Sequence, residues 1–426
     1  MANRLVYRNA LAASIALTLL SLGGCGDSSS NSPDVPDFGK PTNPQDPSEP
    51  QEPTDPDQPG VRSIGVVASV SSDWASGGVS YYDTDNNFEP SGPFHEGISD
   101  IDVVGGQGFF YYIEKFGTDR ISRIDITNPA QKTWTFSTNK EGVTSSSNPY
   151  TLVTVSADKA YLLRYDSSEV WIVNPGATVE QDFYLDSIDL SAFSHDGQSA
   201  PQMADAILVE GKLYIAIQRL KSWAPDQAGL IIVIDTTSDV IIDVNPDTPD
   251  IDAIELQGFN PSELAYLDDA GLIISHIGTY TYSPNVLGDG GIELLDPVTL
   301  TSKMVVPQTD ETGNISSIAI KDKDTGYFTG YRFQGWTDPA LTEVFTFDPT
   351  PEAGVASGNA EAIAHLGTSD FRDVAISPDG NLWVANASTT TPGIHVLDPG
   401  TNSEIIFVDS PEGLLPENIT FVTTPR

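Results

Sequence analysis

The sequence predicts an all-β fold: a seven-bladed β-propeller that is closed by its C-terminal strand and preceded by a disordered, proline-rich linker. Three observations lead to this prediction. A short apolar segment that ends in Asp or Asn recurs seven times, a hairpin pattern precedes the recurring segment, and one spare strand-like segment follows the last unit.

The recurring segment is a run of β-branched and aromatic residues that stops at Asp or Asn, often beside Pro or Thr. It recurs at intervals of 42 to 61 residues. Asp and Asn bond to their own downstream backbone and Pro cannot continue a ladder, so these residues end strands. The seven strand-ending residues are Asp83, Asp125, Asn174, Asp235, Asp296, Asp348 and Asp398.

The hairpin pattern consists of two apolar runs joined by Asp-Gly, Glu-Gly or a similar pair, which is a tight-turn signal. Residues 373–387, "DVAISPDGNLWVANA", and residues 206–218, "AILVEGKLYIAIQ", show it. Each unit therefore reads as strand, short turn, strand, longer loop, strand, Asp turn and strand. Residues 61–426 give about 52 residues for each of seven such units, a length typical of propeller blades.

The two ends of residues 61–426 complement each other. The first unit, from residue 64, lacks an inner strand, and the segment "ENITFVTT" at residues 417–424 is left over after the seventh. We expect this segment to supply the missing strand, because closing the ring removes open sheet edges. Trp383, inside a strand of the last unit, is expected in the core.

Residues 1–24 read as a secretory signal peptide. Arg4 and Arg8 precede an apolar run that ends in Leu22-Gly23-Gly24-Cys25. This ending resembles the lipobox of bacterial lipoproteins, which implies that Cys25 is acylated, for example with palmitate, and anchors the chain in the cell envelope. In a Gram-negative cell the resemblance implies the outer membrane, on its periplasmic or its outer side. Cys25 is the single cysteine, so we expect no disulfide.

Residues 25–60 are expected to form a stalk between this anchor and the propeller. Prolines recur there at every third position, which matches the three residues per turn of polyproline II. These prolines are Pro41, Pro44, Pro47, Pro50, Pro53, Pro56 and Pro59.

The chain carries 60 Asp and Glu against 20 Lys and Arg, a formal net charge of −40. So acidic a surface repels phosphate backbones, which excludes nucleic acid as a partner. The charge favours either solubility alone or binding of a cation such as Ca²⁺. The sequence contains no HExxH, GxSxG or P-loop motif, so we assign no catalytic residue and expect a binding protein rather than an enzyme.

The loops between the second and third strands of the units are long and rich in aromatic residues and arginine. In a propeller these loops share one face, and such residue types dominate binding energy. We therefore expect a ligand-binding face there, the alternative being that some of the aromatics pack between blades. Its candidate residues are Trp74, Phe116, Tyr165, Arg219, Trp223, His276, Tyr280, Arg332 and Trp336.

Polar residues stand where each inner strand begins, and these strands should bring them together at the mouth of the central channel. The aligned positions are Asp100, Thr151, Asp205, Glu263, Ser317, Asp373 and Asn418. Crowded carboxylates favour a divalent cation, so Asp100, Asp205, Glu263 and Asp373 are the candidate metal ligands. The alternative is that each side chain accepts hydrogen bonds from backbone N–H groups.

Residues 148–175, "NPYTLVTVSADKAYLLRYDSSEVWIVNP", and residues 373–402, "DVAISPDGNLWVANASTTTPGIHVLDPGTN", resemble the repeats of YVTN/YncE-like propellers. With the lipobox and stalk, the plan is similar to that of surface lipoproteins that capture cobalamin above a TonB-dependent transporter. The resemblance implies a monomeric, membrane-anchored binding protein whose partner is a small molecule, such as cobalamin, or an outer-membrane receptor.

Two other functions remain open. Propeller lactonases hold a divalent metal with Glu, Asn and Asp at inner strand ends, and Glu263, Asn418 and Asp373 match those residue types. That similarity implies a metal-dependent hydrolase at the channel mouth. The second alternative is a protein-interaction or adhesion module.

Overall fold

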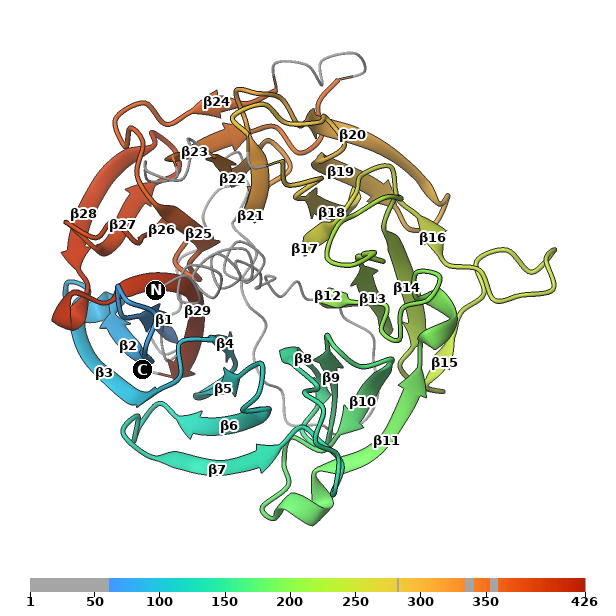
Figure 1. The fold of residues 1–426 in the computed structure, drawn as a ribbon. Helices are drawn as coiled ribbons and strands as arrows, with labels where there is room; N and C mark the ends of the chain where they lie inside the picture. The colour runs from blue at the N-terminus through green and yellow to red at the C-terminus, as the bar shows by residue number, and fades with distance from the viewer. Residues whose placement is uncertain (1–60, 282, 334–340, 353–358, 426) are drawn as a thin grey trace, which may run out of the picture.

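The computed structural model describes residues 61–281, 283–333, 341–352 and 359–425. Within these ranges seven antiparallel sheets surround a central axis, and the inner strands β29, β4, β8, β12, β17, β21 and β25 lie nearest to it (Figure 1). The seven-bladed, all-β prediction is confirmed. The expected signal peptide, Cys25 and the proline-rich stalk lie outside the described residues.

In each blade the strands follow one another from the inner strand outward. Blade 1 contains β29 (Leu415–Pro425), β1 (Val61–Val70), β2 (Gly77–Asp83) and β3 (Glu89–Gly97). Blade 2 contains β4 (Ile101–Gly105), β5 (Phe109–Glu114), β6 (Arg120–Asp125) and β7 (Lys132–Ser137). Blade 3 contains β8 (Pro149–Ser156), β9 (Lys159–Arg164), β10 (Glu169–Val173) and β11 (Tyr184–Asp189).

The remaining four blades follow the same order. Blade 4 contains β12 (Met203–Val209), β13 (Lys212–Ile217), β14 (Leu230–Asp235), β15 (Val240–Ile241) and β16 (Ile254–Glu255). Blade 5 contains β17 (Pro261–Leu267), β18 (Gly271–His276), β19 (Gly291–Asp296) and β20 (Thr301–Pro307). Blade 6 contains β21 (Asn314–Asp322), β22 (Thr325–Arg332), β23 (Leu341–Phe347) and β24 (Glu361–Ala362). Blade 7 contains β25 (Phe371–Ile376), β26 (Leu382–Asn386), β27 (Gly393–Asp398) and β28 (Ser403–Asp409).

Helical structure in the described residues is limited to short 3-10 turns, and none of them is long or apolar enough to cross a bilayer. These turns are η1 (Thr84–Asn86), η2 (Glu180–Asp182), η3 (Ser191–Phe193) and η4 (Pro411–Gly413).

The recurring Asp or Asn ends the third strand of each blade by a shared hydrogen bond. At all seven positions a side-chain oxygen accepts the backbone N–H two residues downstream, at 2.8 to 3.1 Å. This bond starts the turn to the outer strand, so the pattern seen in the sequence has a single local cause.

The C-terminal strand β29 closes the ring, as expected. It pairs antiparallel with β1, placing Ile64 opposite Val422 and Val66 opposite Thr420. Trp383 of blade 7 is fully buried against this junction, with its ring 5.2 Å from that of Phe421. A Cβ added at Gly65 would lie 2.6 Å from the Trp383 ring, so glycine is required there.

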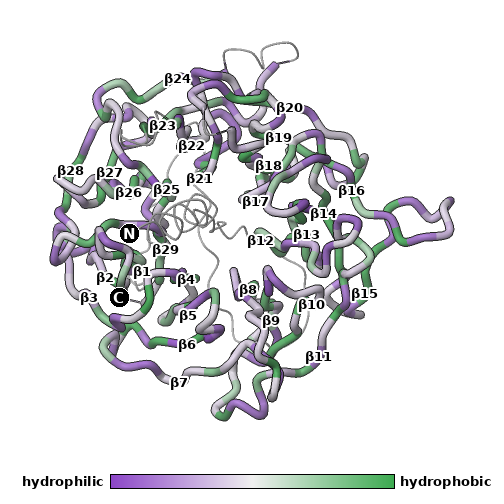
Figure 2. The backbone as a smooth tube through the Cα atoms, viewed as in Figure 1, coloured by the Kyte–Doolittle hydropathy of each residue, from purple (hydrophilic) through white to green (hydrophobic). Residues whose placement is uncertain are grey.

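Apolar side chains fill the spaces between neighbouring blades. One cluster joins blades 3 and 4 through residues such as Tyr161, Leu163, Ile215 and Ile232, and each of the six other large clusters likewise links two adjacent blades. Figure 2 shows hydrophobic and hydrophilic residues alternating along many strands, while the segment that projects beside β15 and β16 is mainly hydrophilic. The core is therefore a ring of seven interfaces.

Blade 4 departs from the regular plan. Its outer edge consists of two short strands, β15 and β16, both paired with β14, and the segment between them extends outward from the ring (Figure 1). That segment, "DVNPDTPDID" at residues 243–252, contains two prolines and four acidic residues. Such a composition cannot continue a ladder, which explains one of the longest intervals in the repeat.

Candidate functional site

The longer loops of blades 2, 3 and 4 surround a hollow of about 370 Å³ on the face where the inner strands begin. Three of these loops follow the second strand of a blade. Phe116 lies in the loop after β5, Asp166 in the loop after β9, and Ser222 and Trp223 in the loop after β13. The others come from the connections between blades. The hollow is lined by Phe116, Ser145, Ser146, Asp166, Gln198, Ser199, Ala200, Gln202, Ser222 and Trp223.

Two large aromatic side chains at this hollow are exposed. The exposed fraction is 63% for Phe116 and 62% for Trp223. Ser222 and Trp223 have left-handed backbone conformations, with φ of 51° and 69°. Such conformations cost about 1–3 kcal/mol each in non-glycine residues, and observed strain of this kind is concentrated at functional sites.

The strained turn that carries Trp223 is held by reciprocal backbone hydrogen bonds between Lys221 and Ala224, of 2.9 and 3.1 Å. The backbone thus fixes the turn. The fold therefore keeps the indole ring of Trp223 at the surface, where the hydrophobic effect does not stabilise the position of the ring.

Trp223 is the outer end of a column of aromatic rings. Its ring stacks on Tyr165, with centroids 6.4 Å apart and planes 13° apart, and Tyr165 stacks on Tyr150 at 4.4 Å. The ammonium group of Lys115 lies 4.6 Å from the centre of the Tyr150 ring. Tyr165 and Tyr150 are buried, and burial raises the pKa of both phenols.

The column is fixed by hydrogen bonds as well as by packing. The Tyr165 hydroxyl donates to Oε1 of Gln218, whose Nε2 donates in turn to the carbonyl oxygen of Pro261 at 3.0 Å. These bonds join blades 3, 4 and 5, so the rings beneath Trp223 cannot turn freely.

The polar part of the lining consists of hydroxyls, amides and one carboxylate. Asn148 donates to Oδ2 of Asp166 at 3.1 Å, whereas Oδ1 accepts no hydrogen bond among the described residues. Burial raises the pKa of Asp166 to about 6. No lysine, arginine or histidine belongs to the described lining.

The channel mouth lies beside this hollow, and its carboxylates connect neighbouring blades. The backbone N–H of Leu264 donates to Asp205 at 2.8 Å, that of Ile318 to Glu263 at 2.8 Å and that of Ile419 to Asp373 at 2.7 Å. In each case the donor belongs to the inner strand of the next blade. These three carboxylates thus accept hydrogen bonds from backbone N–H groups, which is the alternative to metal binding. The bonds connect the inner strands of successive blades.

The alignment of the second blade was wrong by two residues. Asp102, not Asp100, stands at the position equivalent to Asp205, and it forms a buried ion pair of 2.9 Å with Lys115. Both side chains are only 2% exposed. Asp100 instead accepts the backbone N–H of Phe116 at 3.2 Å. Lys115 therefore links the channel mouth to the aromatic column.

Burial also sets the protonation of the channel carboxylates. It raises the pKa of Asp205 to about 7 and that of Asp373 to about 7. Burial and the nearby Asp373 charge hold the pKa of Glu263 well above its ordinary value. In the described parts of the chain, no group of three or more His, Cys, Asp or Glu side chains is arranged to hold a metal ion.

The other candidate binding residues are dispersed around the ring. Trp74 is half-buried with the Arg372 guanidinium 4.7 Å from its ring, and His276 is fully buried 3.0 Å from Glu293. Tyr280 bonds to the Tyr331 hydroxyl at 2.7 Å in blades 5 and 6. Arg332 forms an ion pair with Glu343. Arg219 is half-buried, and its backbone N–H donates to the carbonyl oxygen of Pro201. Trp336 lies outside the described residues.

Of the residues predicted from the sequence, Phe116 and Trp223 line the hollow. The polar residues of the lining were not predicted. Asp166 directly follows Tyr165 and Ser222 directly precedes Trp223, whereas the other serines and both glutamines lie in the connections "NKEGVTSSSN" and "LSAFSHDGQSAPQ". The signal available was the length of these two connections between blades, which exceeds that of a simple turn.

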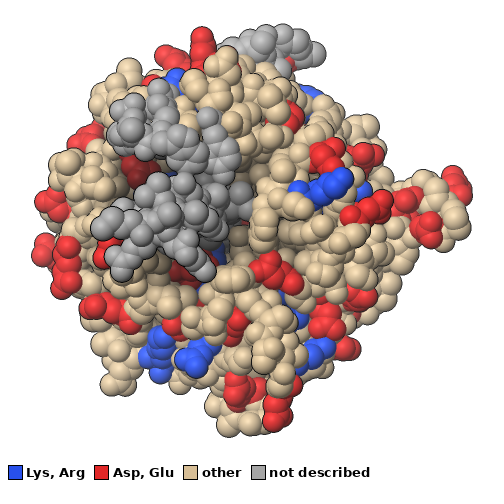
Figure 3. Space-filling view, in the orientation of Figure 1, with Lys and Arg blue, Asp and Glu red and all other residues tan. Residues whose placement is uncertain are grey.

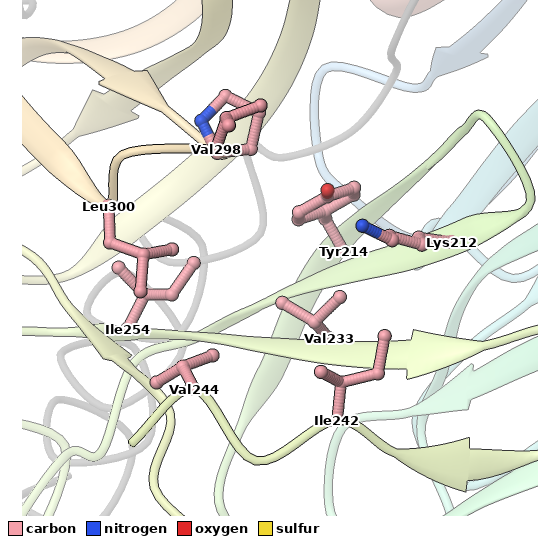
Figure 4. A pocket seen from close by; sticks show the side chains of 9 residues that line it. Lys212, Tyr214, Val233, Ile242, Val244, Ile254, Val298 and Leu300 are labelled. Carbon is pink, nitrogen blue, oxygen red and sulfur yellow. The ribbon is translucent and has the colours of Figure 1, made fainter. Parts of the chain in front are cut away.

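A second, smaller hollow of about 150 Å³ lies at the opposite end of blades 4 and 5, against the turn that follows β19. Figure 4 shows its mainly apolar lining, with Lys212 and Tyr214 at one side. Acidic side chains are spread over the face seen in Figure 3, whereas Lys and Arg gather at a few places. The mixed polar and aromatic hollow beside Trp223 is the stronger candidate site.

Neither a protein-family model nor a curated protein matches the chain. Solved structures do match it. A candidate 6-phosphogluconolactonase from Bacteroides uniformis is 12% identical, with a TM-score of 0.54, covering 85% of this chain and 99% of that one. A protein from Lactobacillus plantarum is 13% identical, with a TM-score of 0.53, covering 84% and 99%. A candidate 6-phosphogluconolactonase from Bacteroides fragilis is 14% identical, with a TM-score of 0.50, covering 87% and 100%. These similarities show the fold.

Proposed function

We propose that this chain is a lipid-anchored, extracytoplasmic binding protein that takes a small-molecule ligand into the hollow between Phe116 and Trp223. The observation that carries the proposal is the exposed Trp223 ring on its strained turn, stacked on a buried aromatic column. A hollow of about 370 Å³ is within the usual size of small-molecule sites, which combine apolar walls with a few polar groups.

The anchored location is supported by the sequence alone. The run ending in Cys25 resembles a lipobox, and residues 25–60 have the composition of a stalk. Labelling cells with radioactive palmitate is expected to mark the wild-type chain and not the Cys25→Ala variant. Label retained by Cys25→Ala would refute lipidation at that residue, and it would leave the ligand proposal untouched.

The ligand proposal is tested by equilibrium binding to the purified full-length chain in detergent. The probes are neutral saccharides, sugar phosphates, nucleosides, amino acids and cyanocobalamin, the last also followed by its visible spectrum. We expect at least one probe to bind, and the double substitution Phe116→Ala/Trp223→Ala to weaken it at least about tenfold.

Leu185→Ala is the matched control, because Leu185 is an exposed apolar residue on β11, away from the hollow. It should bind like the wild type. Absence of binding by every probe at millimolar concentration, or binding that the double substitution leaves unchanged, would overturn the proposal. Retention by an outer-membrane receptor alone, with no small-molecule binding, would favour the interaction-module alternative instead.

A hydrolase at the channel mouth is the second candidate, supported by the candidate lactonase names of two structural neighbours. The channel carboxylates do not suit a resident divalent cation such as Ca²⁺. Asp205, Glu263 and Asp373 each already accept a backbone N–H from the next blade, and burial favours their neutral forms. Lactone hydrolysis that rises with added metal and is lost in Glu263→Gln would favour this candidate over the first.

A further inference from the structure

Building on the proposed function, we infer that the ligand in the hollow is a neutral, polyhydroxylated molecule: a saccharide whose ring stacks on Trp223. Three features of the site carry this inference: the exposed ring faces, the charge of the lining and the two fixed polar groups beside Trp223. Each feature restricts the chemistry of the ligand in a different way.

The exposed rings call for a flat, weakly polar surface on the ligand. Tyr165 covers one face of Trp223, so the indole offers its other surface to the hollow. The carbon-bound hydrogens of a pyranose ring carry partial positive charge and form such a surface, which complements the negative face of an aromatic ring. Phe116 adds a second apolar wall to the same hollow.

The charge of the lining disfavours an anion. Asp166 is the single charged residue among the described lining residues, and the whole chain carries a net charge of −40. A sugar phosphate or a sugar acid would have to place its charge near this carboxylate without a compensating lysine or arginine. The ligand is therefore uncharged at the end that enters the hollow.

The polar groups also distinguish a saccharide from a cation. A cation would be matched by acceptors alone, but three serines and two glutamines of the lining offer donors as well, whereas the fourth serine, Ser146, already donates to Asp119. Gln202 shows this most clearly, because the backbone N–H of Leu220 donates to its Oε1 at 3.0 Å. The amide nitrogen of Gln202 is thus the group oriented for donation.

Asp166 supplies the complementary acceptor. Asn148 occupies its Oδ2, which leaves Oδ1 for a ligand hydroxyl. A fixed donor and a fixed acceptor at one hollow match hydroxyl groups, each of which can both accept and donate. Hydrogen bonds within the protein already orient the Gln202 amide and the Asp166 carboxylate, so binding costs little side-chain conformational entropy.

The inference is tested by isothermal titration calorimetry of the full-length chain with paired probes. The neutral probes are oligosaccharides of glucose, xylose and N-acetylglucosamine, and the charged partners are glucose 6-phosphate and glucuronate. We expect a neutral saccharide to bind, and its charged partner to bind at least about tenfold more weakly.

The variants separate stacking from hydrogen bonding. Trp223→Ala should weaken saccharide binding at least about tenfold, whereas Trp223→Phe, which keeps an aromatic face, should stay within about threefold. Asp166→Asn and Gln202→Ala should each weaken it by about threefold to tenfold. Leu185→Ala should not change it, and thermal unfolding midpoints identify any variant that fails to fold.

The outcomes distinguish this inference from the proposed function on which it depends. Tighter binding of the charged partners, or saccharide binding indifferent to Trp223→Ala, would overturn the saccharide assignment. If a different probe binds and depends on Phe116 and Trp223, the saccharide assignment fails and the binding function stands. If no probe depends on these two residues, both fail.

Discussion

The backbone N–H of Ile419 in the closing strand donates a 2.7 Å hydrogen bond to Oδ2 of Asp373 in blade 7. The other carboxylate oxygen of Asp373 accepts the hydroxyl of Ser317 in blade 6, also at 2.7 Å. One buried side chain therefore joins three consecutive inner strands, β21, β25 and β29. Its protonation should consequently affect how firmly the ring is closed.

The first prediction concerns pH. Burial raises the folded-state pKa of Asp205 and Asp373 to about 7, whereas unfolded aspartate titrates near ~3.9. The folded protein thus holds more protons in this range, so these groups favour folding most at acidic pH, and their contribution declines as pH rises towards 7. We expect the urea midpoint of the wild type to fall between pH 5 and pH 8.

The double variant Asp205→Asn/Asp373→Asn checks this origin, because an amide does not titrate there. Its urea midpoint should change less with pH than that of the wild type. Asp247→Asn, at an exposed residue of the blade 4 insertion, controls for the general repulsion among acidic residues. Equal pH slopes in the wild type and the double variant would contradict the prediction.

The second prediction concerns the buried ion pair between Lys115 and Asp102. Lys115→Met should lower the free energy of unfolding by about 3–5 kcal/mol, because it removes the ammonium group that offsets the buried charge of Asp102. Lys115→Met/Asp102→Asn should recover part of this loss. Urea titration of the two single variants and the double variant gives the coupling energy, and additive losses would show that the pair does not act as a unit.

The third prediction concerns the packing at Gly65. Gly65→Ala should destabilise the fold by about 1–3 kcal/mol, because the new methyl group would meet the ring of Trp383. Gly97→Ala is the control, since its nearest neighbour would lie 3.6 Å away at ordinary contact distance. Thermal unfolding should show a lower midpoint for Gly65→Ala alone; similar midpoints for both variants would argue against tight packing at this junction.

The fourth prediction concerns the closing strand. Deleting residues 415–426 exposes the edge of β1 along its whole length, so the chain should lose cooperative unfolding and aggregate. A synthetic peptide of residues 415–425 should restore a cooperative transition when added to the truncated chain, and a scrambled peptide should not. A truncated chain that stays monomeric and unfolds like the wild type would contradict this view of the ring.

The fold was predictable because its signals are local and repeated. Each strand-ending Asp or Asn makes its bond within three residues, so its role can be read from neighbours in the chain. The alignment failed in blade 2 because Asp100-Ile101-Asp102-Val103 presents two polar residues, each followed by an apolar one. A strand has a period of two, so a shift by two residues leaves the alternation intact and cannot be detected in one sequence.

The candidate site was predictable only in its residue types and its face. Phe116 and Trp223 are exposed, whereas Tyr165, from an equivalent loop, is buried. The difference arises because Tyr150, from the neighbouring inner strand, stacks on Tyr165 and Trp223 covers it. Contacts between segments distant in sequence decide such burial, and residue type alone does not contain them.

The pairing of β1 with β29 also has a consequence for how the protein is made. The ribosome makes β1 before, and β29 after, the other strands of the described residues, so the sheet of blade 1 lacks its innermost strand until β29 has been made. Closing contacts between the two ends of a chain form slowly, because they bring together its most distant segments. A nascent chain therefore stays in an open form until β29 has been made, and an open chain is the form in which a polypeptide can be threaded through a narrow pore.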